Sequence, residues 1–263
     1  MDLQLKKKIA LVTGSTAGIG HAIALSLARE GASVIVNGRA QASVDAAAAR
    51  IKGETGGEVR GFAGDLSLAS AAEELLRQHP TVDILVNNLG IFEVRAFEDI
   101  SDADWQRFFD VNVLSGARLA RLYFPKMRAR NWGRIIFISS ESGYHIPAEM
   151  IHYGMTKAAQ IAVARGLAER TAGTAVTVNT ILPGPTRSRG VGDFVGEMAA
   201  AAGKTAAEVE QEFFQTARPT SLLKRFAAPE EVAALVTYVA SPLSSATNGA
   251  ALRVDGGVIK TAF

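Results

Sequence analysis

The chain of 263 residues contains no cysteine. Disulfide bonds and thiolate chemistry are therefore excluded, because both require the sulfur of cysteine. The absence of cysteine is compatible with a reducing compartment but does not require one.

Long apolar segments are absent as well. No apolar run approaches the 18 residues typical of a membrane-spanning helix, and the N-terminus lacks an apolar stretch followed by a small-residue cleavage site. We therefore expect a cytoplasmic protein without a membrane partner.

An excess of charge of one sign is also lacking. The chain has 28 Lys and Arg against 26 Asp and Glu, for a formal net charge of +2, and no dense basic run beyond residues 6–8. Nothing therefore indicates a nucleic-acid partner. No cluster of His, Asp and Glu has the spacing of metal ligands, so we expect no catalytic metal.

The chain does have enough apolar residues, 48%, to build a large core. Its length admits one α/β domain or two smaller domains. Short apolar runs, typical of strands buried on both faces, alternate with long amphipathic stretches. The expected strands are 9–13, 33–37, 59–63, 84–87, 134–139, 175–181 and 250–254. The expected helices are 18–30, 42–52, 68–78, 102–129, 152–171 and 229–240.

Alternation of strands and helices is typical of βαβ units and a parallel sheet. No segment has the Pro, Gly and Ser content of a linker. The sequence therefore predicts one doubly wound α/β domain over residues 1–263, with a parallel seven-stranded sheet flanked by helices on both faces.

One segment, residues 186–226, interrupts this alternation between the last two expected strands. It contains four glycines and then a helix start at Thr205–Glu208 with the spacing of a capping box. A connection of this length has a function more often than it merely joins two elements, and we therefore predict that it is a substrate lid. Its apolar side chains either line the substrate or pack on the body of the protein: Phe194, Met198, Phe213 and Phe214.

A glycine-rich stretch, TGSTAGIG, occupies residues 13–20 immediately after the first expected strand. Its glycines allow a sharp turn and close approach to a ligand, and the helix that they open presents free N–H groups to an anion. The spacing differs from the general G-x-G-x-x-G fingerprint, so a tight turn alone is the competing interpretation. The predicted phosphate contacts are Gly14, Ser15, Thr16, Gly18, Ile19 and Gly20.

The end of the second strand predicts which dinucleotide binds. An acidic residue usually contacts the ribose 2′-hydroxyl there, whereas this chain has Asn37, Gly38 and Arg39. Arg39 can pair with a 2′-phosphate, so we predict NADP(H) over NAD(H), with a solvated loop arginine as the alternative. Asp65 is either an acceptor for the adenine amino group or a turn residue.

Further motifs follow in order along the chain: NNLG at 87–90, DVNV at 110–113, ISSESG at 138–143, YGMTK at 153–157, PG at 183–184 and LRVDGG at 252–257. With the glycine-rich loop, they resemble those of the short-chain dehydrogenases/reductases of the classical type. The resemblance covers residues 13–257, and the 13-residue interval between Ser140 and Tyr153 also fits it.

The resemblance implies a Rossmann-type fold and a homotetramer formed through the helices that carry Asn112 and Tyr153. It implies a catalytic tetrad of Asn112, Ser140, Tyr153 and Lys157. The cofactor contacts that it implies outside the glycine-rich loop are Leu66, Asn88, Gly90, Tyr153, Lys157, Pro183, Gly184 and Thr186. The family usually has Ala at position 89; we expect Leu89 to be accommodated, because Gly90 is retained.

Tyr153 and Lys157 lie four positions apart and share one face if the stretch is helical. Without a cofactor, a surface tyrosine covered by a lysine stem is the ordinary interpretation. Beside a nicotinamide, the phenol of Tyr153 can act as acid/base for a carbonyl or alcohol. An ammonium at roughly 4–5 Å favours the phenolate by about 3–4 kcal/mol at an effective dielectric of about 20, so we expect Lys157 to lower the pKa of Tyr153.

The remaining tetrad roles follow from the resemblance. Lys157 is expected to hydrogen-bond the nicotinamide ribose, and Ser140 to donate to the substrate oxygen. Asn112 is expected to position a water that links Lys157 to solvent. His145 and His152 are assigned to the rim or an interface rather than to catalysis.

The sequence therefore predicts an oxidoreductase that transfers a hydride between NADP(H) and a carbonyl or secondary alcohol. An NAD-dependent alcohol dehydrogenase of the same family and a non-catalytic NADPH-binding sensor remain alternatives. An acyl-transfer role for Ser140 is excluded by the lack of a G-x-S-x-G elbow. The substrate stays open among thioesters, sugars, steroids and small ketones, because a fold does not determine its pocket.

Overall fold

Seven parallel strands form the centre of the structure, a computed structural model that describes residues 1–188, 191–192, 196, 199–200 and 203–262. The strands lie in the order β3-β2-β1-β4-β5-β6-β7, and every neighbouring pair is parallel. Their bounds are β1 (Ile9–Val12), β2 (Ser33–Gly38), β3 (Val59–Ala63), β4 (Ile84–Asn87), β5 (Gly133–Ile138), β6 (Val176–Pro183) and β7 (Ala251–Val254). The predicted parallel seven-stranded sheet is confirmed.

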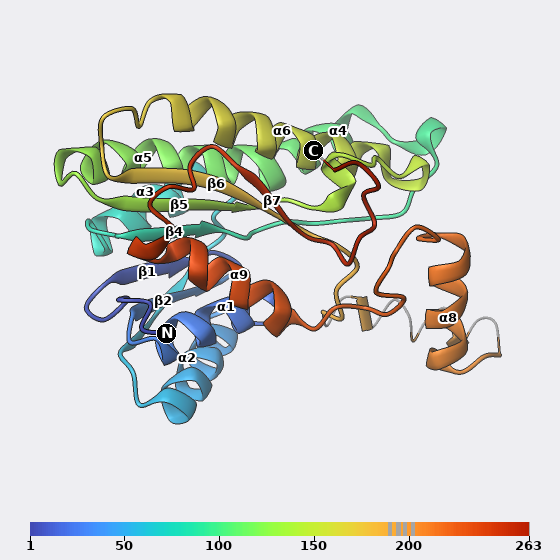
Figure 1. Cartoon of the computed structure of the whole chain (residues 1–263), viewed down its shortest axis with the longest axis horizontal. Coiled ribbons are helices and arrows are strands. Elements are labelled where there is room, and N and C mark those ends of the chain that lie inside the picture. Colours follow the sequence, from blue (N-terminus) through green and yellow to red (C-terminus); the bar gives the residue numbers. More distant parts are fainter. Residues whose placement is uncertain (189–190, 193–195, 197–198, 201–202, 263) are drawn as a thin grey trace.

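Helices cover both faces of this sheet and give three layers (Figure 1). One face carries α1, α2 and α9, and the other carries α3, α5 and α6. The helix bounds are α1 (Gly18–Arg29), α2 (Gln41–Thr55), α3 (Ala69–Gln78), α4 (Asp102–Phe109), α5 (Ser115–Ala129), α6 (Ile151–Glu169), α8 (Ala206–Thr216) and α9 (Pro229–Ala240). None of the helices in the described part of the chain is both long and apolar enough to span a membrane.

Each interface between layers is an apolar core. Ile23, Leu27 and Val236 are fully buried between the sheet and the helices α1 and α9. Leu75 and Tyr123 are fully buried in the second core, on the opposite face. The strands β5 and β6 are buried at every position, as the continuous apolar runs predict for central strands covered on both faces.

The expectation of one continuous α-helix over residues 102–129 is wrong. Here α4 ends at Phe109, a π-helical turn spans Asp110–Leu114, and α5 begins at Ser115. The N–H of Ser115 donates to the carbonyl of Asp110, five residues earlier, which defines the wider turn. Apolar periodicity does not reveal this change, because the pattern continues on both sides of a single turn. Its consequence is functional, since the turn contains Asn112.

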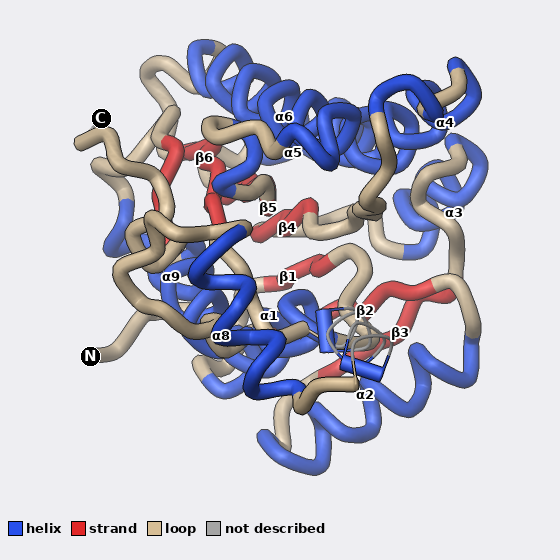
Figure 2. The backbone as a smooth tube through the Cα atoms, turned by 90° about the vertical axis from the view of Figure 1, so that its right-hand side faces the viewer, coloured by secondary structure: helices blue, strands red, loops and turns tan. Residues whose placement is uncertain are grey.

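The order in which the chain adds strands to the sheet reverses between β1 and β4, which pair side by side near the centre of the molecule (Figure 2). From β1 the chain builds outward through β2 and β3, and from β4 it builds outward on the other side. In open α/β sheets of this kind, the crevice at the carboxyl ends of the two central strands binds ligands. The fold therefore locates the candidate site at that end.

The segment between β6 and α9 leaves the three layers, and its helix α8 lies apart from them (Figure 1). The capping box predicted at its start is confirmed: Thr205 and Glu208 bond to each other's backbone N–H. Phe213 and Phe214 pack with Phe226, at 5.2 Å between ring centroids in each case. The two aromatic residues of α8 thus pack within the segment. Phe194, Met198 and Arg189 lie outside the described residues.

A pair of leucine substitutions tests the core. Leu27→Ala on α1 removes a fully buried side chain, whereas Leu243→Ala removes one that is 42% exposed. We expect Leu27→Ala to lower the free energy of unfolding by about 2–5 kcal/mol, because it removes apolar burial and leaves a cavity. Leu243→Ala should cost less than about 1 kcal/mol. Chemical denaturation measures both, and equal losses would contradict this assignment of the core.

Candidate active site

The loop between β1 and α1 has no room for side chains at its glycines. Gly14 and Gly18 have φ of +59° and +56°, in the left-handed region that favours glycine. A Cβ atom on Gly20 would lie 2.4 Å from the carbonyl oxygen of Gly14 and 2.5 Å from Nδ2 of Asn88. The turn is therefore close-packed backbone, as a phosphate cradle requires.

The start of α1 is suited to an anion. Its N-cap residue, Ala17, provides no side-chain hydrogen bond, and the first turn contains no acidic residue. The N–H groups of that turn, together with the positive end of the helix dipole, can therefore bind a phosphate. The residues present fit the pyrophosphate of a dinucleotide.

Asn37 organises this loop, a role that sequence reasoning missed. Its Oδ1 accepts from the N–H of Gly14 at 3.1 Å, and its Nδ2 donates to the carbonyls of Phe62 and Gly64. The hydroxyl of Ser15 accepts from the N–H of Asn37 at 2.9 Å. Asn37 therefore replaces the usual acid with an amide that joins β1, β2 and β3. Its near-complete burial, 1% exposed, could not be inferred from the sequence.

Asn88 holds the other side of the loop. Its Nδ2 donates to the carbonyls of Thr13 and Gly14 at 3.0 and 3.1 Å. The hydroxyl of Thr13 accepts from the N–H groups of both Asn88 and Leu89 at 2.9 Å. The side chain of Leu89 is partly buried against the core next to Gly14.

The predicted adenosine-side residues lie at the carboxyl ends of β2 and β3. Arg39 is exposed directly after Gly38, whose Cβ would lie 2.5 Å from the side chain of Thr16 in the glycine-rich loop. Asp65 accepts from the N–H and hydroxyl of Ser67 at 3.0 and 2.6 Å, the geometry of a turn. Leu66 is buried in the core, which leaves its backbone for ligand contact.

The structure brings Lys157 and Asn112 together beside Gly90, and Ser140 next to Tyr153. Ser140 follows β5, while Tyr153 and Lys157 share one face of α6. A Cβ atom on Gly90 would lie 3.4 Å from Nζ of Lys157 and 3.5 Å from Oδ1 of Asn112. Gly90 is therefore needed for the backbone to pass this close to the catalytic side chains.

Lys157 and Asn112 are joined by a residue that the sequence analysis did not single out, Gln160. Nζ of Lys157 donates to the carbonyl of Ile138 at 3.0 Å and to Oε1 of Gln160 at 3.2 Å. Nε2 of Gln160 donates to the main-chain carbonyl of Asn112 at 2.6 Å. This amide joins Lys157 to the π-helical turn, while the water that we expected Asn112 to position stays a prediction. The position of Gln160, three residues after Lys157 on a helix, was the available signal.

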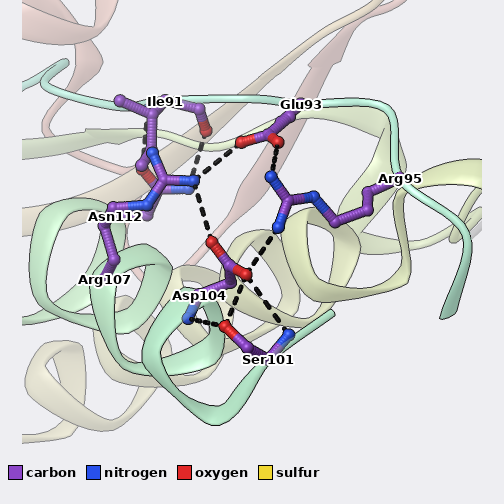
Figure 3. A network of polar contacts seen from close by, with 7 residues as sticks. All are labelled: Ile91, Glu93, Arg95, Ser101, Asp104, Arg107 and Asn112. Atoms are coloured by element: carbon purple, nitrogen blue, oxygen red, sulfur yellow. Dashed lines mark hydrogen bonds and ion pairs between the residues drawn. The ribbon is translucent and has the colours of Figure 1, made fainter. Parts of the chain in front are cut away.

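The side chain of Asn112 binds the loop after β4 instead (Figure 3). Its Oδ1 accepts from the N–H of Ile91 at 2.8 Å, and its Nδ2 donates to the carbonyl of Ile91 at 3.0 Å. Nδ2 also donates to the hydroxyl of Thr156 on α6 at 2.9 Å. Asn112 therefore fixes that loop against the helix that carries Tyr153.

The same loop is held by a network of ion pairs (Figure 3). Arg95 and Arg107 each bridge Glu93 and Asp104, with 2.6 Å between Arg95 Nη1 and Asp104 Oδ2. Asp104 also completes a capping box with Ser101 at the start of α4. Several partly exposed pairs that share partners lose less side-chain entropy per contact than isolated pairs do, so the network can hold the loop.

The expected lowering of the Tyr153 pKa by Lys157 is wrong for this structure. Burial raises the pKa of Tyr153 above its ordinary value. Among the neighbouring groups, Glu141 raises this pKa further, whereas Ser140 and Arg218 lower it. Nζ of Lys157 lies 5.5 Å from the centroid of the Tyr153 ring and donates to other acceptors. Burial also lowers the pKa of Lys157, to about 8. The dominant effect at both groups is desolvation, which disfavours charge of either sign.

Ser140 does not direct its proton toward an open site. Its hydroxyl donates to Oε2 of Glu141 and accepts from the N–H of Ser142 at 3.1 Å. Oε1 of Glu141 in turn accepts from Nε of Arg218 at 2.9 Å. Sequence reasoning missed Glu141 and Arg218, because 77 residues separate them along the chain.

The turn after β6 lies where the resemblance places the nicotinamide. Pro183 ends β6, and a Cβ atom on Gly184 would lie 2.5 Å from the carbonyl oxygen of Asp255. The hydroxyl of Thr186 donates to the carbonyl of Gly184 at 2.9 Å. A Cβ atom on Gly18 would lie 3.3 Å from Cβ of Ser188, so this turn reaches the glycine-rich loop.

The two histidines that the sequence placed at the rim or an interface differ in their surroundings. His152, expected at the rim or an interface, is instead fully buried, with its ring 4.0 Å from that of Phe108. His145 has its N–H bonded to the carbonyl of Glu141. Within the described ranges, no group of three or more His, Asp and Glu could hold a metal ion, and the expected absence of a metal stays a prediction.

Comparisons with known proteins agree with this geometry. A sequence model of the short chain dehydrogenase family matches residues 8–198. The chain is 48% identical over 264 residues to the uncharacterized oxidoreductase YvrD of Bacillus subtilis, covering 99% of this chain and 100% of the relative. It is 36% identical over 258 residues to a D-beta-hydroxybutyrate dehydrogenase of Cupriavidus necator, covering 96% and 98%.

Among solved structures, the chain is similar to L-sorbose reductase from Gluconobacter frateurii complexed with NADPH and L-sorbose. The sequence identity is 31% and the TM-score is 0.93, with 99% of this chain and 100% of that chain covered.

Gly20→Ala tests the phosphate cradle. The added Cβ atom would overlap Gly14 and Asn88, so we expect affinity for NADPH to fall at least about tenfold, or ~1.4 kcal/mol. The matched control is Gly166→Ala in α6, where a Cβ atom meets no heavy atom within 4 Å. Titrations followed by protein fluorescence compare the two variants. Equal affinities would show that the loop does not bind the cofactor.

Proposed function

Because the chain belongs to the short-chain dehydrogenase family, we propose that it transfers a hydride between NADP(H) and a carbonyl or secondary alcohol, with Tyr153 as acid/base. The observation that carries the proposal is that Tyr153 lies beside Ser140 and 5.5 Å from Nζ of Lys157, at the sheet end that bears the glycine-rich loop. The L-sorbose reductase with NADPH bound supports both the cofactor and the substrate class.

When bound, the nicotinamide cofactor supplies or accepts the hydride. Tyr153 moves the proton. Burial raises its pKa, so the phenol is neutral near pH 7 and can donate a proton to the oxygen of a carbonyl under reduction. The reverse reaction needs the phenolate, which burial disfavours. The site therefore favours reduction at neutral pH.

Lys157 is held for a supporting role. In the described part of the chain, two of its three N–H donors bind Ile138 and Gln160, which leaves one for a ribose hydroxyl. With its pKa lowered to about 8, Lys157 is still mostly protonated at pH 7. Gln160 then fixes where the ammonium lies. For Ser140 to donate to the substrate oxygen, its proton must turn away from Glu141.

The preference for NADP(H) rests on Arg39 and Asn37. Arg39 is exposed beside the glycine-rich loop, in reach of a 2′-phosphate, and no acid stands at the end of β2 to bind a 2′-hydroxyl. The runner-up function is an NAD-dependent alcohol dehydrogenase of the same family. We further propose that residues 1–263 form one domain, in which segment 186–226 covers the substrate. The homotetramer stays a prediction.

Tyr153→Phe tests the reaction. L-sorbose with NADPH and D-β-hydroxybutyrate with NADP⁺ are the first substrates, chosen from the two relatives. We expect turnover to fall about 10²–10⁴-fold, because the proton donor is lost, while affinity for NADPH changes little. Tyr238→Phe on α9, where the ring is 41% exposed, is the matched control and should retain wild-type turnover. Full activity of Tyr153→Phe would exclude the mechanism.

Arg39→Asp tests the cofactor preference. Loss of a charge-assisted contact costs roughly 1.5–3 kcal/mol, so the ratio of NADPH to NADH affinity should fall tenfold or more. Binding titrations with both cofactors measure this ratio without any substrate. An unchanged ratio would instead favour the NAD-dependent alternative.

A further inference from the structure

A buried ion pair connects Ser140 to the segment between β6 and α9. Nε of Arg218 lies 2.9 Å from Oε1 of Glu141, with side chains only 8% and 5% exposed. Glu141 directly follows Ser140 in the turn η3 (Glu141–Gly143), and Arg218 follows α8. The two residues are 77 positions apart in the sequence, so this is a tertiary contact.

The hydrogen bonds of Glu141 account for the proton of Ser140. Oε2 of Glu141 accepts from the hydroxyls of Ser140 and Ser142, at 2.5 and 2.7 Å. A serine hydroxyl has one proton and two lone pairs. The proton goes to Glu141, and one lone pair accepts from the N–H of Ser142. The Ser140 side chain also lies beside Tyr153, because its hydrogen bond lowers the pKa of the phenol.

Arg218 is held by contacts of its guanidinium and of its backbone. Its Nη1 donates to the carbonyl of Ala217 at 2.9 Å and lies 3.5 Å from Oε1 of Glu149. Its backbone N–H donates to the carbonyl of Phe213, in the last turn of α8. The guanidinium therefore ties the end of α8 to two carboxylates beside the catalytic serine.

A buried ion pair is weak evidence for stability, because desolvation of two charges offsets their attraction. Loss of one partner is costly, because it leaves an uncompensated buried charge. Without Arg218, the carboxylate of Glu141 is expected to turn toward solvent and release Ser140. Glu141 can thus hold Ser140 only while Arg218 is docked.

We propose that Glu141 is a positioning residue that fixes the side chain of Ser140 beside Tyr153, and that Arg218 makes this position depend on the docking of α8. The proposal rests on the proposed function for its catalytic consequence. Its structural consequence, the coupling of α8 to Glu141, is independent of turnover.

The two charges act on Tyr153 in opposite directions. Glu141 raises the pKa of Tyr153, and Arg218 lowers it. Two further charged groups lie near by: Lys157 on the same helix as Tyr153, and Glu149 beside Arg218. Removal of the Glu141 charge should therefore lower the pKa of Tyr153, and removal of the Arg218 charge should raise it. The cluster of Glu93, Arg95, Asp104 and Arg107 faces His152 instead.

The kinetic arm of the test compares Glu141→Gln with Arg218→Gln in the full-length protein. The assay is reduction of L-sorbose with NADPH, or the reaction of D-β-hydroxybutyrate with NADP⁺ if that is the substrate turned over. Both variants should lose at least about tenfold in kcat. The midpoint of the pH profile assigned to Tyr153 should move down in Glu141→Gln and up in Arg218→Gln, by about one pH unit for a charge some 7–10 Å away.

The second arm needs no substrate. Amide hydrogen exchange is measured at Ala217, Arg218 and Ser221, whose N–H groups are bonded at the end of α8. In Glu141→Gln their exchange should accelerate at least tenfold, because the docked arginine has lost its charged partner. Arg225→Gln is the matched control, since its ion pair with Glu231 is 50% and 41% exposed, and should change neither exchange nor pH profile.

The double variant Glu141→Gln/Arg218→Gln guards against simple misfolding. It buries no unpaired charge, so it should be more stable than either single variant, with a pH midpoint near that of the wild type. Unchanged exchange in Glu141→Gln overturns the coupling to α8. Shifts of the two midpoints in the same direction, or no shift, overturn the positioning role.

The two proposals can fail separately. If the wild type consumes neither substrate, the proposed function fails for these substrates, while accelerated exchange in Glu141→Gln still supports the coupling. If the wild type is active and exchange is unchanged, the proposed function stands and the coupling is excluded.

Discussion

The arrangement of the site depends on one interaction network, in which the buried polar groups of Lys157 and Asn112 find partners inside the protein. An unpartnered buried group costs roughly 1–3 kcal/mol. Lys157 finds its partners in Ile138 and Gln160, and Asn112 in Ile91, Thr156 and the same glutamine. These partners lie on β5, on α6 and in the loop after β4. The hydrogen bonds that hold the site therefore also hold β5, α6, the π-helical turn and the loop after β4 together.

The chemistry of the site follows from the same burial. Desolvation disfavours the charged form of any group, so it raises the pKa of Tyr153 and lowers that of Lys157 to about 8. A neutral phenol is a ready proton donor, and a reduced carbonyl needs one. At Tyr153 the desolvation thus outweighs the charge of Lys157, whose spacing on the helix had predicted a lowered pKa.

Backbone geometry and side-chain amides divide the work of binding the cofactor. The glycines of the first loop allow the approach, while Asn37 and Asn88 fix the loop against β2, β3 and β4. An uncapped helix start then presents free N–H groups. The end of β2 carries no acid whose negative charge would repel a 2′-phosphate, which agrees with the proposed preference for NADP(H).

The sequence by itself determined the sheet, most helices and the capping box of α8, because these depend on local periodicity and on motifs only a few residues long. The catalytic tetrad stays a prediction from such motifs. The π-helical turn at Asn112, the amide bridge of Gln160 and the contact of Glu141 with Arg218 were decided by tertiary structure alone. The same is true of the pKa shift of Tyr153. Each depends on which groups meet after folding and on how much water remains around them. The spacing of residues along the chain encodes neither these contacts nor the amount of water around them.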